Sequence, residues 1–239
     1  MVVSRSTAAP HEMEGRVWFG DTALPLEDHI RILGVDVDRE LRFGLHLQTI
    51  ARQASLRVSA LRRVASFLDS RGILLLYKAQ IRPYLEYAAL SWMSSAPTHI
   101  RKLDKVERRV MRLVEGNHLQ PPSQDLAPLD SLEYRRDVGA LVVLHKAQVQ
   151  EVPHLTRLRL PLRVARRDTR TVSTTDQLVD VPRSRSSQHL RTYTARTARL
   201  WNTFTAATPA VQQMSTAQVK LAAHRWRAAL PTPMMLLVT

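Results

Sequence analysis

The most concentrated chemical feature of this sequence is positive charge on one helical segment. Between Thr98 and Gly116, apolar residues recur every three or four positions, which predicts an amphipathic helix capped by Thr98 and ended by Gly116. Between Arg101 and Arg112, six cations stand against the two carboxylates Asp104 and Glu107. The cations are Arg101, Lys102, Lys105, Arg108, Arg109 and Arg112. Such a face suits phosphate groups; the alternative is a solvated face, partly neutralised by i,i+4 pairs such as Asp104–Arg108.

The whole chain is basic. Its 239 residues include 35 Lys+Arg and 21 Asp+Glu, a formal charge of +14 and a pI near 11.1. This excess predicts attraction to polyanions, with nucleic acid first and an anionic membrane surface second. The alternative is that the arginine content reflects the base composition of a GC-rich genome.

A second conceivable chemistry is metal binding by Asp36 and Asp38. Residues two apart in a strand share a face, but this pair stands where the predicted strand should end. The nine histidines lack the i,i+4 spacing of a helix-borne zinc site, and there is no cysteine. The sequence also lacks a phosphate-binding loop, a nucleophile elbow and a dinucleotide fingerprint. We therefore expect no metal site, no cofactor and no self-contained catalytic site.

The elements that position these residues change in character along the chain. Val17–Phe19, a turn at Gly20-Asp21 and Thr22–Leu26 read as a β-hairpin, and Ile32–Val37 as a further strand. Apolar residues at helical spacing follow from about residue 45 to 68, with the arginines Arg52, Arg57 and Arg62 mainly off the apolar stripe.

A second helix is predicted from Asp69 or Ser70, which can act as its N-cap, to about Leu85. It carries Lys78 and Arg82, and Pro83 should kink or restart it. Proline residues between 117 and 130 then indicate a linker.

After the linker, Ser131 or Asp130 can cap a fourth helix. An arginine- and threonine-rich stretch at 157–170, a short strand at Leu178–Val181 and helices near 192–204 and 216–230 follow. We expect this region to be basic, looser and partly irregular. Three tryptophans at helical spacing could stack on bases, although core packing is the commoner role. They are Trp92, Trp201 and Trp226.

These elements predict an α+β fold that is mostly α. Short N-terminal antiparallel strands at 1–40 lead into an amphipathic helical bundle at 41–116, and the linker and basic helical region occupy 117–239. The N-terminus has no long apolar run, and no segment approaches ~20 uninterrupted apolar residues. We expect a non-secreted, intracellular protein of the nucleus and cytoplasm that does not span a membrane.

Seven short runs of this sequence carry a resemblance to a known family. They are Leu33-Gly34-Val35, Leu41–His46, Leu75–Ala88, Leu103–Arg109, Ser131–Arg136, Val181–Arg185 and Arg199–Asn202. Similar runs occur in the same order in the C-terminal part of reverse transcriptases of non-LTR (LINE-like, jockey-type) retrotransposons, which the chain resembles over roughly residues 1–230. At Phe43 the family usually has tryptophan.

This resemblance implies that residues 1–40 are the edge of a polymerase palm, with Ile32–Val37 as the primer-grip strand, and that Leu45–Val114 is the thumb. Gly34 would let the backbone approach a primer; the alternative is that it only eases a bend or bulge. The family's palm aspartates, which hold magnesium, have no counterpart, because no Tyr-x-Asp-Asp occurs here. The chain alone is therefore expected to be inactive as an RNA-directed DNA polymerase.

The expected partners are RNA, DNA or an RNA–DNA hybrid, and the missing catalytic portion of the polymerase. The expected nucleic-acid-binding residues are Gly34, Arg52, Arg57, Arg62, Lys78, Arg82, Arg101, Lys105, Arg108, Arg109 and Arg112. A retroelement remnant kept by its host as a protein-interaction or structural module is the alternative, and a membrane-surface helix is a weaker third hypothesis.

Overall fold

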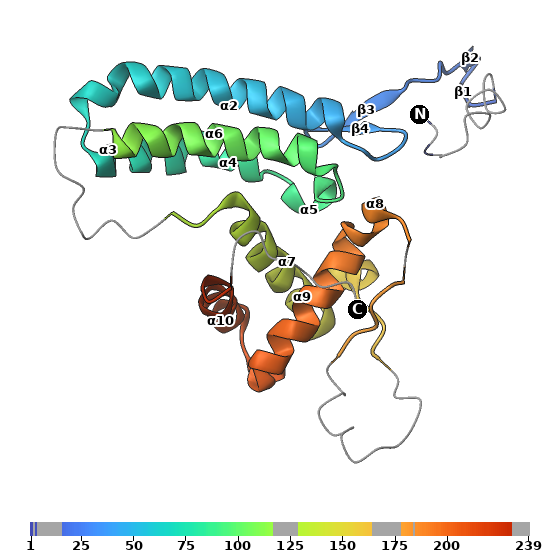
Figure 1. Cartoon of the computed structure of the whole chain (residues 1–239). Helices are drawn as coiled ribbons and strands as arrows, with labels where there is room; N and C mark the ends of the chain where they lie inside the picture. The colour runs from blue at the N-terminus through green and yellow to red at the C-terminus, as the bar shows by residue number, and fades with distance from the viewer. Residues whose placement is uncertain (2, 4–15, 117–128, 164–177, 184, 231–239) are drawn as a thin grey trace. The chain divides into compact units, whose positions relative to one another are not determined.

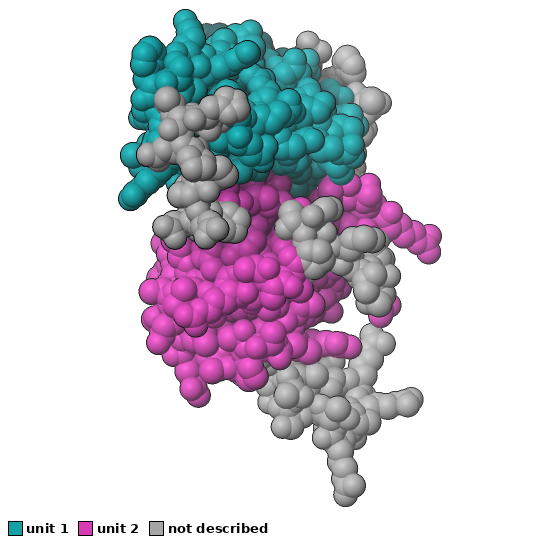
Figure 2. Space-filling model, turned by 60° about the vertical axis from the view of Figure 1, so that its left-hand side comes forward, with its two compact units in different colours: residues 1–127 teal, residues 128–239 magenta. Residues whose placement is uncertain are grey.

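The computed structural model describes residues 1–239 apart from 2, 4–15, 117–128, 164–177, 184 and 231–239 (Figure 1). The chain forms two compact units, Met1–Ala127 and Pro128–Thr239 (Figure 2). The expected class is confirmed: the described residues are mostly helical, with two short antiparallel strand pairs near the N-terminus. Most of the predicted linker and the arginine-rich segment from 164 onward lie outside the described residues.

Two hairpins open the first unit. Strands β1 (Trp18–Phe19) and β2 (Thr22–Ala23) pair around the turn at Gly20-Asp21, as predicted. Strands β3 (His29–Ile32) and β4 (Val35–Asp38) pair antiparallel, so the prediction of a single strand at Ile32–Val37 is wrong.

The chain reverses at Leu33 and Gly34, whose φ angles are +46° and +85°. A two-residue hairpin turn with two left-handed residues matches the right-handed twist of the strands it joins. Gly34 is therefore a turn residue, rather than a strand residue or a bulge.

A helical bundle follows. Its elements are α2 (Gly44–Val64), α3 (Ser70–Leu76), α4 (Arg82–Glu86), α5 (Ala89–Trp92) and α6 (Pro97–Glu115), with a 3-10 turn at Ala65–Phe67 and a π-helical turn at Tyr77–Ile81. Helices α2 and α6 lie side by side in the same direction, and α3 and α4 return in the opposite direction (Figure 1). The predicted apolar stripes of α2 and α6 meet in the core. Their buried members are Leu47, Ile50, Ala54, Val58, Leu61, Leu103, Val106 and Val110.

The helix ends test the local predictions. Asp69 caps α3, since its side chain accepts a hydrogen bond from the Gly72 N–H at 2.6 Å. The restart expected at Pro83 is also confirmed, because α4 begins at Arg82 after the π-helical turn. Thr98 is not the cap of α6. That helix begins at Pro97, whose fixed φ suits the first helical position and whose missing N–H costs nothing there.

The second unit contains α7 (Leu132–Gln148), α8 (Ser187–Leu190), α9 (Tyr193–Ala207) and α10 (Thr216–Ala228), with 3-10 turns at Pro153–Leu158 and Pro209–Gln213. Ser131 caps α7, as predicted, with Oγ 3.2 Å from the Tyr134 N–H. The predicted strand at Leu178–Val181 is reduced to a single bridge between Leu162 and Val179.

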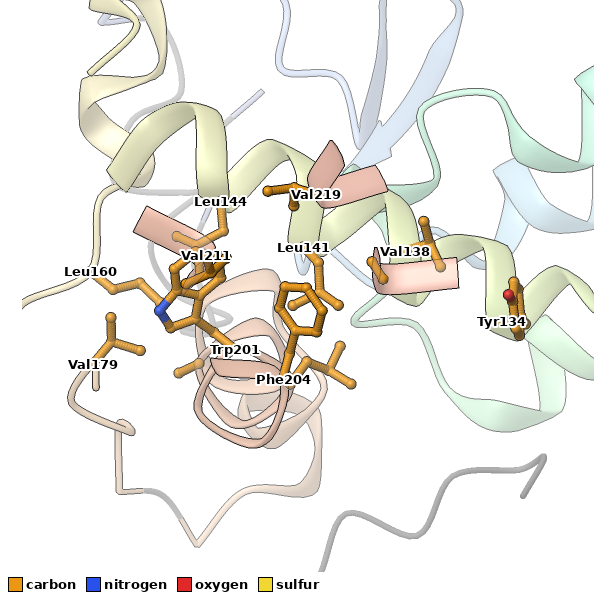
Figure 3. Packing of buried hydrophobic residues seen from close by; sticks show 13 residues of the cluster. Tyr134, Val138, Leu141, Leu144, Leu160, Val179, Trp201, Phe204, Val211 and Val219 are labelled. Atoms are coloured by element: carbon orange, nitrogen blue, oxygen red, sulfur yellow. The ribbon is translucent and has the colours of Figure 1, made fainter. Parts of the chain in front are cut away.

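The described part of the second unit is not a loose appendage. Apolar side chains of α7, α9 and α10 pack into one core around Trp201 and Phe204 (Figure 3). Trp92 and Trp201 are fully buried, and Trp226 packs edge-on against Phe204. The packing role is therefore confirmed for these three tryptophans.

A buried carboxylate ties the three main helices of this unit together. Asp137 on α7 is fully buried and accepts hydrogen bonds from Arg196 on α9 at 2.7 and 3.0 Å, and from Arg227 Nε on α10 at 3.0 Å. Arg196 also reaches Glu133 at 3.0 Å. Burial tends to lower the pKa of Arg196, but Asp137 and Glu133 raise it overall, so the arginine stays charged.

Replacing Asp137 by alanine should leave Arg227 buried without its charge partner. We expect Asp137→Ala to lower the free energy of unfolding of the second unit by about 3–5 kcal/mol. Hydrogen exchange of peptides from α7, α9 and α10 would measure the loss. Asp180→Ala, at an exposed position, is the matched control. Equal protection in the two variants would contradict the assigned role.

Candidate nucleic-acid interface

The cations of α6 lie on one face. At about 100° per residue, positions 101, 102, 105, 108, 109 and 112 fall within an arc of about 120°. We call this set the α6 cationic face. Five of its six members are exposed, and Lys102 is half-buried. The exposed members are Arg101, Lys105, Arg108, Arg109 and Arg112. The sequence pattern thus becomes a continuous positive strip along the outside of the helix.

Of the three carboxylates of α6, Asp104 and Glu115 lie at one edge of this strip and Glu107 lies away from it. Glu107 is buried on the opposite side, where its Oε1 accepts a hydrogen bond from the Tyr77 hydroxyl at 3.1 Å. Burial, and then the charge of Glu107, raise the pKa of Tyr77, so the hydroxyl remains a donor. Arg108 Nε lies 3.4 Å from the backbone carbonyl of Asp104. Glu107 is therefore not available to neutralise the cationic face, whereas Asp104 stays close to Arg108.

The arginines of α2 are spread around that helix. Arg52 and Arg62 are exposed. Arg109 Nη1 of α6 donates to Ser55 Oγ of α2 at 3.2 Å, which places that flank of α2 beside the α6 cationic face. Arg57 lies elsewhere: its guanidinium covers the ring of Tyr84, 3.9 Å from the centroid, and its Nη2 donates to the tyrosine hydroxyl at 2.5 Å.

The remaining expected residues lie on other elements. Lys78 is exposed on the π-helical turn. Arg82 begins α4, with Nε 3.9 Å from Glu86 Oε2. Gly34 is at the tip of the β3–β4 hairpin. The structure thus gathers the α6 residues on one face, while Arg57, Arg82 and Gly34 lie on separate elements.

Asp36 and Asp38 each serve the protein itself. Asp38 Oδ1 accepts the N–H groups of Glu40 and Arg42, at 3.1 and 2.9 Å, and its Oδ2 accepts that of Phe43 at 2.5 Å. In the described part of the chain, no three acidic, histidine or cysteine side chains are grouped as a metal site would need.

Asp36 instead faces His46. The Asp36 N–H lies 3.3 Å from His46 Nδ1, and the Asp36 carboxylate lies 3.5 Å from the same atom. His46 is buried, so this contact with Asp36 lies inside the protein. Burial lowers the pKa of this imidazole below 6.5, although Asp36 acts in the opposite direction.

Two features of this surface can be read from the sequence, and a third cannot. Lys102 has the spacing of the α6 cationic face, and Glu107 falls at the spacing of the buried positions. The contact between Arg57 and Tyr84 joins residues 27 positions apart, on two different helices. No local pattern predicts it.

The chain is similar to a known protein over part of its length. It is 26% identical over 103 residues to a Drosophila melanogaster protein described as "Probable RNA-directed DNA polymerase from transposon X-element". The match covers 42% of this chain and 11% of the fly protein. No protein-family model matches the chain, and no solved structure matches it. The similarity supports a relationship with transposon reverse transcriptases.

The described helices include none with the length and apolar character needed to cross a bilayer.

Asp38 should be the residue on which the junction between hairpin and bundle depends. Asp38→Ala removes the acceptor of three backbone N–H groups, and we expect a loss of about 1–3 kcal/mol in the free energy of unfolding of the first unit. Urea denaturation would measure it, and faster hydrogen exchange in the first turn of α2 would locate it. Asp28→Ala, at an exposed position before β3, should change stability by less than about 0.5 kcal/mol. A similar loss in both variants would refute this role of Asp38.

Proposed function

We propose that this chain is a C-terminal, thumb-containing part of a non-LTR, jockey-type reverse transcriptase. In this proposal it binds RNA, DNA or their hybrid through contacts between arginines and phosphates. The observation that carries the proposal is the α6 cationic face, and the similarity to a transposon polymerase supports it.

The dimensions of that face suit a nucleic-acid backbone. From Arg101 to Arg112 the helix rises about 16 Å, and duplex DNA carries one charge per ~1.7 Å of its axis, so about ten charges lie within reach of this length. A helix meets one side of a duplex, which leaves about four to six phosphate contacts. Such contacts do not read sequence, as a polymerase that moves along its template requires.

The hairpin contributes to this proposal through its tip. Leu33 is 87% exposed at the β3–β4 turn, beside Gly34. In our proposal this turn, rather than a continuous strand, approaches the primer. Gly34 then serves a close backbone approach as well as its own left-handed conformation.

Nucleotide transfer would need carboxylates that this sequence does not supply. In reverse transcriptases two metal ions hold the reacting groups. Asp36 and Asp38 do not fit that role, because Asp38 is engaged by three backbone N–H groups and the Asp36 carboxylate lies 3.8 Å from Arg31 Nε. We assign magnesium binding and catalysis to another part of the polymerase.

Exposed apolar side chains support a protein partner for the first unit. Trp18 is 60% exposed and Phe19 81% exposed on the β1–β2 hairpin. A larger palm sheet would cover these side chains, so the catalytic portion of the polymerase is the proposed partner. The same observation favours the second candidate function, a host-retained remnant that acts as a protein-interaction module.

Removing the α6 cationic face should weaken nucleic-acid binding. We expect Arg101→Ala, Lys105→Ala, Arg108→Ala and Arg112→Ala, combined in one variant, to flatten the slope of log affinity against log salt by about three to four units. Fluorescence anisotropy with an RNA–DNA hybrid, measured at several salt concentrations, checks this result.

The matched control removes the same charge from exposed positions of the second unit. It combines Arg157→Ala, Arg183→Ala, Lys220→Ala and Arg225→Ala. The control should keep most of the salt slope. Equal losses in the two variants would mean that net charge alone binds nucleic acid. A protein partner that binds the α6 variant normally would support the interaction-module alternative.

The chain alone should not extend a primer. We expect no nucleotide incorporation in a primer-extension assay with magnesium and an RNA template, because the metal-holding aspartates are absent from the sequence. Binding of the same template to the chain must be measured separately. An absence of incorporation can then be attributed to missing catalysis and not to missing binding. Robust incorporation would overturn this part of the proposal.

A further inference from the structure

A pocket of about 340 Å³ lies between the β3–β4 hairpin, the N-terminal half of α2 and α4, within the first unit. It is lined by Arg31, Gly34, Asp36, His46, Thr49, Ile50, Gln53, Pro83, Tyr84 and Tyr87. Its α2 residues lie on one flank of that helix. Ser55, which contacts the α6 cationic face, lies on the other flank. The pocket and the cationic face are therefore separate features of the same bundle.

The pocket wall contains a buried donor with no acceptor. His46 is 3% exposed, and its Nδ1 accepts the Asp36 N–H at 3.3 Å. A neutral imidazole whose Nδ1 accepts this bond carries its proton on Nε2. Among the described residues, no group accepts a hydrogen bond from His46 Nε2, which is buried. Because an unpaired buried N–H is costly, an acceptor on a ligand would stabilise this arrangement.

Two tyrosine rings are held in place at the pocket. The Tyr87 hydroxyl donates to the Leu33 carbonyl at 2.6 Å, and its ring lies against Gly34. Arg57 covers the ring of Tyr84 at 3.9 Å and donates to its hydroxyl. Rings fixed in this way lose little conformational entropy when a flat group stacks on them.

The size and chemistry of the pocket select its ligand. Its volume is at the lower end of the ~300–1,000 Å³ typical of small-molecule sites, which suits one base or nucleoside. Gln53 can both donate and accept hydrogen bonds, as a base edge requires. A phosphate is disfavoured, because Asp36 lines the wall and the one cation there, Arg31, lies 3.8 Å from that carboxylate.

We propose that this pocket binds an unpaired nucleobase, with its face against a tyrosine ring and an acceptor on its edge bonded to His46 Nε2. Where the base belongs to a nucleic-acid strand, this inference rests on the proposed nucleic-acid binding. A free nucleotide carries the same base and would bind the pocket in the same way. The pocket adds recognition of unpaired bases to a chain whose cationic face recognises only the backbone.

The first experiment compares two substrates. One is a blunt RNA–DNA duplex and the other has a short single-stranded extension that carries 2-aminopurine. We expect the wild-type protein to quench the fluorescence of the unpaired 2-aminopurine and to bind the extended substrate more tightly. Tyr84→Leu and His46→Asn should lower affinity for the extended substrate, by about 5- to 100-fold for Tyr84→Leu, and leave duplex affinity unchanged. Asn can still accept the Asp36 N–H but cannot replace the Nε2 donor.

Gln53→Leu and Gln80→Leu form a matched pair. Gln53 lines the pocket, whereas Gln80 is exposed on the π-helical turn outside its lining. Only Gln53→Leu should reduce the preference for the extended substrate. Equal effects of the two variants, or a loss of duplex affinity in parallel with the loss for the extended substrate, would overturn the inference.

A second experiment needs no variant and no oligonucleotide. The wild-type chain is titrated with adenosine 5′-monophosphate, and with ribose 5-phosphate as the control that lacks a base. NMR signals of the Gln53 side chain and of His46 should shift with the first compound only. These shifts would support the pocket even if the chain fails to bind duplexes, which would defeat the proposed function alone. Identical shifts with both compounds, or none, would refute a base site.

Discussion

The Asp38 carboxylate determines how the hairpin meets the helical bundle. It accepts three backbone N–H groups just before α2, in a segment where Leu41 and Phe43 have φ angles of +55° and +56°. Each such left-handed conformation costs about 1–3 kcal/mol, so the segment needs these hydrogen bonds to persist. The Ser95 hydroxyl binds the Arg42 carbonyl at 2.9 Å, which links the same segment to the residues before α6. One carboxylate thereby positions the hairpin, the start of α2 and the start of α6.

That junction also determines which functional surfaces can exist. A side chain at Gly44 would place its Cβ 2.8 Å from the His99 ring, so glycine lets the first turns of α2 and α6 approach closely. The two helices then run side by side, and the buried Tyr77–Glu107 bond turns one acid of α6 inward. Five exposed cations remain on the outward face. Its positive potential is thus a consequence of core packing as much as of composition.

The sequence predicted features that depend on neighbouring residues. Helical periodicity, the Asp69 and Ser131 caps and the restart at Pro83 are local, and each is confirmed. The start of α6 was misplaced by two positions, since the N-cap is Ala96 rather than Thr98 and Pro97 takes the first helical position. The reversal at Gly34 was missed because the apolar run on both sides of it resembles one buried strand. The pocket was unpredictable, since residues from Arg31 to Tyr87 meet only after the hairpin and α4 pack against α2. The compact second unit was missed for a similar reason, because its core depends on Asp137 finding two arginines far along the chain.

The two proposed sites would respond differently to solution conditions, and this difference follows from their chemistry. Contacts between cations and phosphates release counterions, so they weaken as salt rises. Stacking on Tyr84 and a hydrogen bond from neutral His46 displace few ions. A rise in salt should therefore reduce affinity for every substrate while the ratio between unpaired and paired substrates stays nearly constant. In a polymerase this division would let the backbone slide along the α6 face, whereas an unpaired base next to the duplex would be held in register by the pocket.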